Sequence, residues 1–291
     1  MLSVDLREDC SEIVHYDREN YPIYIRKAHL SSYNNFAAPP HWHDDAEFIR
    51  ILQGRMEFRV NEETVSLGPG EGLFVNSRQL HYGFSQSRAE CRFLCALLHP
   101  RLLCALPAIE QNFVDPLREN QSLPCLKLSG AVPWQGELLA ALDRLFEVRE
   151  REAAPLLVSS LFFKIWALLL ENANLSAPKA AQSADLLAFK EMIGYIQRFY
   201  REKITLQSIA KAGAVGQSKC CRLFHRYISQ TPNAYLTQYR LNQSLWFLKN
   251  TDKSITEIAQ LTGFSGSSYY AEAFRKWAHK SPSAYRKEAF F

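Results

Sequence analysis

The feature that most constrains this chain is an internal repeat near its carboxyl end. Residues 206–236 match residues 255–285, so that Ile209 in the first copy corresponds to Ile258 in the second. Two similar units imply two copies of one local structure. The offset between the copies is 49 residues before a turn and 50 after it, which adds one residue between the first two predicted helices of the second copy.

Each copy is predicted to form a helix, a tight turn and a second helix. Thr205 and Ser254 occupy N-cap positions, where a side-chain oxygen accepts a hydrogen bond from an otherwise unpaired backbone N–H. Ser254 and Glu257 have the spacing of a capping box, which satisfies a second such donor. Gly213 and Gly263 mark the two turns.

The second helices and two further helices are predicted from the same punctuation. The second helices of the copies are expected over residues 217–227 and 267–278, and an amphipathic helix over residues 233–249 would hold the units at a fixed separation. Pro232 and Pro282 each begin a helix, at the position where the missing N–H costs nothing. The core anchors of the second helices are Leu223, Phe224 and Phe274.

Charge is divided unevenly along the chain. Residues 186–291 contain 16 Lys and Arg against 6 Asp and Glu, a net charge of +10, whereas residues 1–185 carry −6. Phosphate attraction depends on local charge density, so a compact basic block behind an acidic one is typical of a polyanion-binding module joined to a separate module. A basic surface without a partner is the alternative interpretation.

A helix pair joined by a glycine-containing turn is the shape of the DNA-binding helix-turn-helix, whose second helix enters the major groove. Two rigidly spaced copies would place these helices about 34 Å apart, in successive grooves on one face of the duplex. Residues 186–291 resemble the DNA-binding domain of AraC/XylS-type regulators, and residues 255–286 follow the family signature closely. The matching residues are Gly263, Phe264, Tyr270, Phe274, Pro282, Tyr285 and Arg286.

This resemblance implies which side chains contact DNA. Arg222 is the strongest candidate, because an arginine donates two hydrogen bonds to guanine, worth about 1–3 kcal/mol of discrimination. Glu272 stands where the family usually has arginine, and it either accepts from a cytosine amino group or faces solvent and repels phosphate. The implied base-reading residues are Gln217, Ser218, Cys221 and Arg222 in the first copy and Ser267, Ser268, Ala271 and Glu272 in the second. The implied phosphate contacts are Lys219, Arg226, Arg275 and Lys276.

Residues 20–100 show short alternating segments separated by turn residues. Met56, Phe58 and Val60 alternate with polar residues, which is the period of a half-buried strand. Further apolar segments follow at residues 64–67 and 73–75. Several short strands at this spacing predict a sandwich or a barrel.

One group of polar residues stands out in this half. His41, His43 and Glu47 have the spacing H-x-H-x3-E, and His81 follows the glycine-rich residues 68–72. Residues two apart on a strand share a face, so both leading histidines are expected to point into the barrel, where Glu47 and His81 join them from adjoining strands. These motifs resemble the cupin fold and the sensory half common in AraC-type regulators.

Three histidines and a carboxylate suit Fe, Mn, Ni, Cu or Zn. Alternatively, these side chains hydrogen-bond a small polar ligand or one another. Attachment to a DNA-binding domain implies sensing rather than turnover, so no cofactor is assigned and a metal ion is kept as the alternative. The expected effector-binding residues are His41, Trp42, His43, Glu47, Phe58 and His81.

Two leucine-rich helices are expected between the modules, over residues 133–148 and 153–172. Either they pack on the barrel or, as the resemblance implies, they supply a dimerisation face. Residues 174–185 are small and polar, include Pro178 and form the expected linker. The predicted apolar faces consist of Leu138, Leu142 and Leu145 in the first helix and Leu157, Leu161, Ile165 and Leu168 in the second.

Cysteine usage and the N-terminal sequence favour a reduced cytoplasmic protein. Seven cysteines are an odd number, and none has CxxC spacing. The first ten residues carry acids where a signal peptide would be basic, and Lys164 interrupts the most apolar stretch, so neither export nor a membrane span is expected. The cysteines are Cys10, Cys91, Cys95, Cys104, Cys125, Cys220 and Cys221.

The sequence therefore predicts an α+β chain of two domains. The expected function is a cytoplasmic, homodimeric transcription regulator, with activation as the working assumption, that binds promoter DNA, a small-molecule effector and RNA polymerase and is not an enzyme. The residues leave the effector, the operator and the sign of regulation open. The alternatives are a metal-dependent cupin enzyme with a basic appendage and an architectural DNA-binding protein without an effector. The expected segments are a cupin-like β-barrel over residues 1–110, a helical connector over residues 111–173, a linker over residues 174–185 and an all-α domain with two helix-turn-helix units over residues 186–291.

Overall fold

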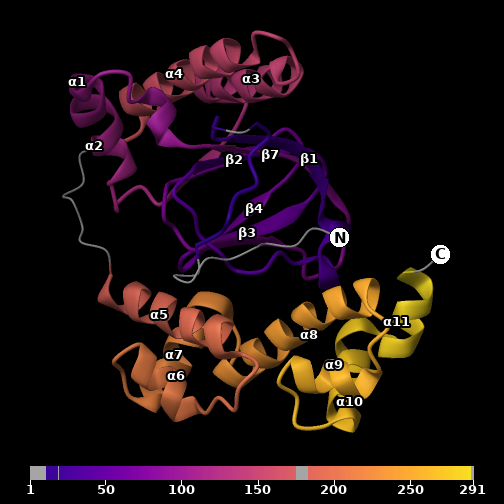
Figure 1. The fold of residues 1–291 in the computed structure, drawn as a ribbon. Coiled ribbons are helices and arrows are strands. Elements are labelled where there is room, and N and C mark those ends of the chain that lie inside the picture. The colour runs from indigo at the N-terminus through magenta and orange to yellow at the C-terminus, as the bar shows by residue number, and fades with distance from the viewer. Residues whose placement is uncertain (1–10, 19, 175–182, 290–291) are drawn as a thin grey trace. The chain divides into compact units, whose positions relative to one another are not determined.

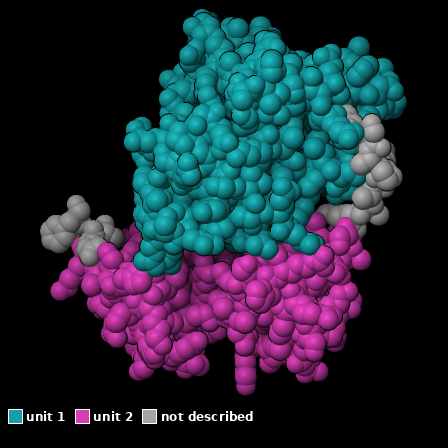
Figure 2. Space-filling view, turned by 180° about the vertical axis from the view of Figure 1, so that it is seen from behind, with its two compact units in different colours: residues 1–7, 11–182 teal, residues 8–10, 183–291 magenta. Residues whose placement is uncertain are grey.

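The structure is a computed structural model that describes residues 11–18, 20–174 and 183–289, and the chain divides into two compact units (Figures 1 and 2). Of the described residues, 11–18 and 20–174 belong to the first unit and 183–289 to the second. The first is rich in strands and the second is helical. The predicted fold class, a β-rich domain followed by an all-α domain, is confirmed.

The first unit contains two antiparallel sheets (Figure 1). Five strands pair in the order β1-β7-β2-β5-β8, and three pair in the order β4-β3-β6. In β3 the predicted alternation is confirmed, because Met56, Phe58 and Val60 are buried while the residues between them are half-exposed. The strands are β1 Ile23–His29, β2 Ala46–Gly54, β3 Met56–Val60, β4 Glu63–Leu67, β5 Gly72–Val75, β6 His81–Phe84, β7 Cys91–Leu98 and β8 Cys125–Leu128.

The larger sheet is buried on both faces. Neighbouring residues of a strand point to opposite faces, so Phe48 packs in the core that it shares with α3 (Pro133–Val148) and α4 (Ala154–Asn172). The next residue, Ile49, belongs to a second core between the sheets, together with Phe58 of β3. The barrel interior is therefore walled by one face of each sheet.

The helical connector predicted over residues 111–173 is wrong in one respect. Residues 125–128 form β8, which pairs with β5 and completes the larger sheet. A strand of four residues is too short to show a periodicity against its surroundings. The remaining short helical segments of this unit are η1 Leu30–Ser32, η2 Asn34–Phe36, η3 Pro100–Leu103, α1 Pro107–Ile109, η4 Glu110–Val114 and α2 Asp115–Arg118.

Helices α3 and α4 pack against each other and on the larger sheet, and their predicted extents are confirmed. The predicted face of α3 is buried, but α4 is rotated so that Val158, Phe162 and Trp166 enter the core while Leu157 and Leu161 are half-exposed. The two aromatic side chains fill more of the core than the leucines beside them would. Among the described helices, α4 is long and apolar enough to cross a membrane, although core helices of this kind meet the same criterion.

The second unit contains the repeat as two helix-turn-helix copies, α6–α7 and α9–α10, joined by the long helix α8 (Figure 1). The loops between the paired helices cover residues 213–216 and 262–266, so the predicted extra residue in the second copy is confirmed. Both predicted caps are present, and each is part of a capping box. The helices are α5 Ala184–Phe199, α6 Leu206–Ala212, α7 Gln217–Ile228, α8 Pro232–Asn250, α9 Ile255–Leu261, α10 Ser267–Ala278 and α11 Pro282–Ala289.

The two turns use their glycines differently. Gly263 has a φ of +80°, and a Cβ atom there would lie 2.4 Å from the Tyr200 carbonyl oxygen, so a larger residue is excluded. The matching position in the first turn is Ala214, at a φ of 52°. Its neighbour Gly213 is needed for a different reason, because a Cβ atom there would lie 2.7 Å from the Ala188 carbonyl oxygen of α5.

The predicted linker extends too far. Helix α5 begins at Ala184, and Asp185 in its first turn complements the positive end of the helix dipole. Ala184 and Asp185 are therefore part of the helical unit, while residues 175–182 of the linker lie outside the described residues.

Candidate DNA-binding surface and ligand cavity

The first surface of interest is the polar face of α7. Phe224 is fully buried and stacks edge-on against Phe189 of α5, with ring centroids 5.0 Å apart, which anchors α7 with its polar face outward. None of the six implied DNA contacts on this helix is fully buried. Gln217, Ser218, Arg222 and Arg226 are exposed, and Lys219 and Cys221 are half-buried.

An acidic residue missed by the sequence analysis contacts this basic face. Asp185 lies 2.7 Å from the Lys219 ammonium group and 3.2 Å from the Arg226 guanidinium group. The hydrogen bond from Lys219, with the charges of Arg226 and Arg222, holds the pKa of Asp185 below its usual range. Three basic side chains of α7 thus surround one carboxylate at the start of α5. No local pattern links residues so far apart in the sequence.

The polar face of α10 is also open to solvent, but its charges are arranged differently. Glu272 and Lys276 form an ion pair of 2.7 Å along the helix, and this contact lowers the pKa of Glu272. Tyr269, which the sequence analysis did not single out, is 51% exposed on the same helix. The remaining implied contacts follow the predicted face: Ser268, Arg275 and Lys276 are exposed, and Ser267 and Ala271 are half-buried.

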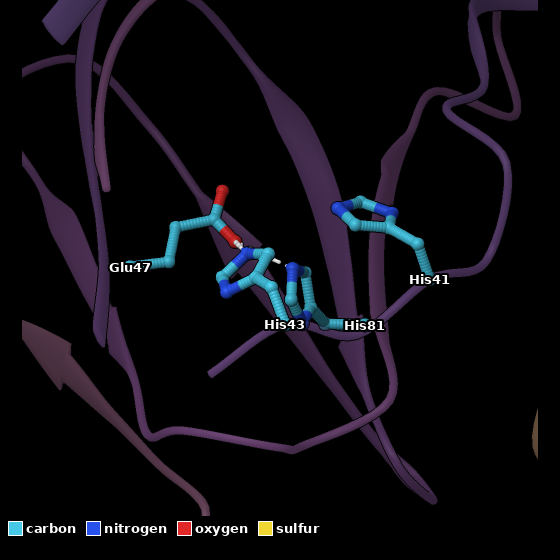
Figure 3. Close-up of side chains that lie close together, drawn as sticks. All are labelled: His41, His43, Glu47 and His81. Carbon is cyan, nitrogen blue, oxygen red and sulfur yellow. Dashed lines mark ion pairs between the residues drawn. The ribbon is translucent and has the colours of Figure 1, made fainter. Parts of the chain in front are cut away.

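In the first unit, the structure brings His41, His43, Glu47 and His81 together (Figure 3). One nitrogen or oxygen atom from each lies within 4.8 Å of the others. The expectation that the first two histidines share a strand is wrong, because both precede β2. A pair of backbone hydrogen bonds between His41 and His81, of 3.2 and 2.9 Å, holds their rings side by side instead.

Backbone carbonyls fix the orientation of all three imidazole rings. The Nδ1 atoms of His41, His43 and His81 lie 2.8, 3.1 and 2.9 Å from the carbonyl oxygens of Pro39, Asp45 and Gln79. A ring that donates through Nδ1–H has its lone pair on Nε2. The Nε2 atoms of His43 and His81 face the Glu47 carboxylate, and that of His41 faces Glu12.

These inward atoms lack hydrogen bonds of good geometry. His81 Nε2 lies 2.6 Å and His43 Nε2 lies 3.6 Å from Glu47 Oε2, yet all three atoms are buried without a hydrogen-bond partner. Acceptors facing one another in a buried site repel unless a cation lies between them. The cluster therefore requires a proton or a metal ion among its side chains.

The charges on the cluster follow from its burial. Desolvation and the neighbouring histidines lower the pKa of His41 to about 3, so this ring is neutral at pH 7. Desolvation also opposes charge on His43, but the Glu47 carboxylate outweighs it and raises the pKa of His43 to about 9. His81 and His43 overcome the burial of Glu47 and hold its pKa well below the usual range. An ionised Glu47 thus faces one cation.

The donor set fits a divalent transition metal. Three imidazole nitrogens and one carboxylate oxygen converge, and a metal ion would take the place of the proton on His43. Each imidazole would donate its other N–H to a backbone carbonyl, as in protein metal sites where such bonds orient the ligands. The residues that would hold the ion are those implied by the sequence: His41, His43, Glu47 and His81.

A cavity of about 220 Å³ extends from this cluster into the barrel. Of the expected effector-binding residues, His41, Glu47 and Phe58 line it. His43 and His81 belong to the adjoining cluster, and Trp42 is buried but does not line the cavity. The polar lining residues are Glu12, His15, Tyr24, Tyr33, His41, Glu47 and Cys95.

Several of these polar residues had no signal in the sequence. Glu12 precedes the first strand, and its carboxylate lies 3.5 Å from His41 Nε2. Tyr33 lies between two 3-10 turns, and Cys95 occurs within an apolar strand. The six cysteines of the described residues are free thiols, whereas Cys10 lies outside the described residues.

Comparison with known proteins gives a consistent result for both units. Residues 27–165 match the AraC-like ligand binding domain, and residues 209–288 match a helix-turn-helix domain. The chain is 28% identical to the uncharacterized HTH-type transcriptional regulator YdeC of Bacillus subtilis over 99% of both proteins. It is 23% identical to the melibiose operon regulatory protein of Escherichia coli, covering 85% of this chain and 83% of that protein.

Among solved structures, ToxT from Vibrio cholerae is similar over 91% of this chain and 98% of its own, at 13% identity and a TM-score of 0.47.

Proposed function

Since this chain belongs to the AraC family of transcriptional regulators, we propose that α7 and α10 read its promoter DNA and that the barrel cavity binds the effector. The observation that carries the first part is the exposure of both polar faces on helices whose apolar sides are fully buried. The net charge of +10 over residues 186–291 would attract the phosphate backbone.

The DNA proposal is tested by binding the full chain to fragments from upstream of its own gene and its neighbours. Arg222→Ala is expected to weaken binding to the preferred fragment by about 5- to 150-fold, the equivalent of 1–3 kcal/mol. Lys164→Ala removes one positive charge from the other unit and is the matched control. Equal losses in the two variants would contradict a specific role for α7.

Regulation further requires that the effector bind the DNA-competent and incompetent arrangements with different affinity. One molecule should therefore both raise the melting temperature of the first unit and change DNA affinity. If ligands that stabilise this unit leave DNA affinity unchanged, the coupling is absent while DNA binding itself stands.

A divalent transition metal held by His41, His43, Glu47 and His81 is the second part of the proposal. Such an ion would supply a Lewis acid at one end of the cavity, where it would polarise a donor group of the effector. Elemental analysis of the purified protein is expected to find one ion per chain, and His81→Ala should remove it. His29→Ala changes an exposed histidine outside the cluster and should retain it. A metal-free protein would overturn this part alone.

The remaining partners follow from the family and are proposed with it. Leu156, 76% exposed on α4, and Phe163 beside it offer an apolar surface for homodimerisation. RNA polymerase is the partner expected of a regulator at a promoter, and the cytoplasm is the expected compartment. We propose no catalytic activity, because the family acts by binding. Leu156→Glu should shift the full chain towards the monomer in sedimentation experiments.

A further inference from the structure

The cavity of the first unit has one polar end. Glu47 and Ile49 of β2 line the cavity, and Gly83 of β6 lines it from the facing sheet, two residues beyond His81. A step of two residues along a strand covers about 7 Å. The cavity thus passes from the histidine cluster into an apolar interior within one such step.

Several of the polar lining groups lie near this end. Burial raises the pKa of the Tyr33 hydroxyl, and the further causes are the nearby Cys95, Tyr24 and Glu47 groups. Cys95 Sγ lies 3.5 Å from Glu47 Oε1. The wall beyond them is apolar, with Ile49, Met56, Phe58 and Phe93 among its residues.

A polyol would fit this wall poorly. Each hydroxyl buried without a hydrogen-bond partner weakens binding, and a sugar has hydroxyls on every side. A molecule with one polar group and an apolar body instead pairs its polar group with the cluster and gains affinity by burying the rest.

Charge restricts the polar group as well. Among the residues that the structure describes, no lysine or arginine lines the cavity, whereas the carboxyl groups of Glu12 and Glu47 do. An anionic ligand would place further negative charge beside these two groups, which opposes its binding. An uncharged hydroxyl or carbonyl group fits best.

Size sets the last limit. A cavity of about 150 Å³ accommodates benzene, and this one has a volume of about 220 Å³, below the roughly 300–1,000 Å³ of sites for drug-sized ligands. It therefore has room for a single ring with one small substituent.

We infer that the effector is a small uncharged amphiphile, of the size of a monocyclic alcohol or ketone, that places its polar group at the Glu47 end and its apolar body between Ile49 and Phe58. This inference rests on the proposed effector role of the barrel and names the chemical class of its ligand.

The test measures binding of three probes to the full chain by calorimetry and by thermal shift. Benzyl alcohol is expected to bind at least about tenfold more tightly than benzoate or glucose, since one unpaired buried polar group or charge costs 1.4 kcal/mol or more. Tighter or equal binding of benzoate or glucose would overturn the inference, as would the absence of saturable binding by benzyl alcohol.

A matched pair of glycine variants locates the binding site. A Cβ atom at Gly83 would lie 3.2 Å from Phe58 and 3.4 Å from Met56, so Gly83→Val should fill the cavity and weaken benzyl alcohol binding at least tenfold. Gly130 has no atom within 4 Å of its Cβ position, and Gly130→Val should leave binding unchanged. If Gly83→Val does not fold, Gly83→Ala tests the same contact. Equal effects at Gly83 and Gly130 would place the ligand elsewhere.

DNA binding is measured in parallel without any probe. If the probes fail while the protein still binds its promoter fragment, the ligand class is wrong and the regulator function stands. If DNA binding also fails, the proposed function itself is wrong.

Discussion

The two helix-turn-helix units share a scaffold but present different surfaces. In the first, Lys219, Arg222 and Arg226 form a basic face on α7, and Asp185 of α5 pairs with Lys219 and Arg226. In the second, Glu272 and Lys276 neutralise each other along α10. The repeat therefore preserves the positions that pack and varies the positions that face outward. We therefore expect the two units to differ in DNA contact more than in stability.

The shared scaffold has a simple packing basis. Helix α8 contributes to both units: Tyr235 near its start contacts Phe224, while Leu245 and Leu248 near its end pack in the same core as Phe274. Both phenylalanines are fully buried. One helix thus links two small cores that neither copy would complete alone.

The largest expected effect tests whether the two copies pack in the same way. Phe224→Ala and Phe274→Ala should each lower the free energy of unfolding by about 3–5 kcal/mol, because each leaves a cavity in a small core. Urea unfolding of the full chain gives the loss, and hydrogen exchange of α7 and α10 assigns it to a unit. Phe→Leu at either site is the milder control. A large loss at one site with none at the other would mean that the repeat does not share its packing.

The next largest effect tests whether the outward faces of α7 and α10 contact DNA differently. Arg222→Ala should reduce affinity for the preferred DNA by about 5- to 150-fold and relax the choice of base at one position, as expected for loss of a bidentate contact. Glu272→Ala should leave the base preference unchanged, because its carboxylate is already paired with Lys276. Binding to a library of operator variants measures both. A changed cytosine preference in Glu272→Ala would show that α10 reads bases as well.

Local features of the fold were predictable from the sequence, and long-range ones were not. Thr205, Ser254 and the prolines at helix starts act within one turn, so the helix boundaries of the repeat were predicted to within a few residues. β8 was missed because its four residues are defined only by pairing with β5.

The residues of the candidate sites were likewise predictable where a local motif marks them and not where only the tertiary fold brings them together. His41, His43, Glu47 and His81 were predicted together from their residue types and spacing, although the geometry that unites them is a backbone pairing outside the strands. Glu12 and Tyr33 line the cavity from segments outside the strands, where no periodic pattern predicts which side chains face inward. Asp185 lies 34 residues before Lys219, the nearer in sequence of its two partners on α7, so no local pattern links them.

A smaller effect concerns the helix starts of the repeat. Ser254→Ala and Thr205→Ala should each cost about 1 kcal/mol, since each removes the acceptor for a backbone N–H at the start of α9 or α6. The two costs should be similar, because the reciprocal bond of each box starts from the backbone N–H of residue 254 or 205, which alanine keeps. Thermal unfolding of the two variants measures both costs. A loss at one site with none at the other would mean that only one of the two caps stabilises its helix.

The smallest expected effect bears most directly on the difference between the units. Asp185 is ionised at neutral pH, since its pKa is lowered, and it occupies Lys219 and Arg226, two implied phosphate contacts. Asp185→Asn should therefore raise DNA affinity by up to about fivefold, the range expected from surface ion pairs, and should steepen the salt dependence. Glu191→Gln makes the same charge change on the same helix and is the matched control. A gain in both variants would reflect net charge alone. A loss of affinity in Asp185→Asn would mean that the carboxylate orients Lys219 and Arg226 for DNA. In that case Asp185 strengthens DNA binding by the first helix-turn-helix copy and does not compete with it.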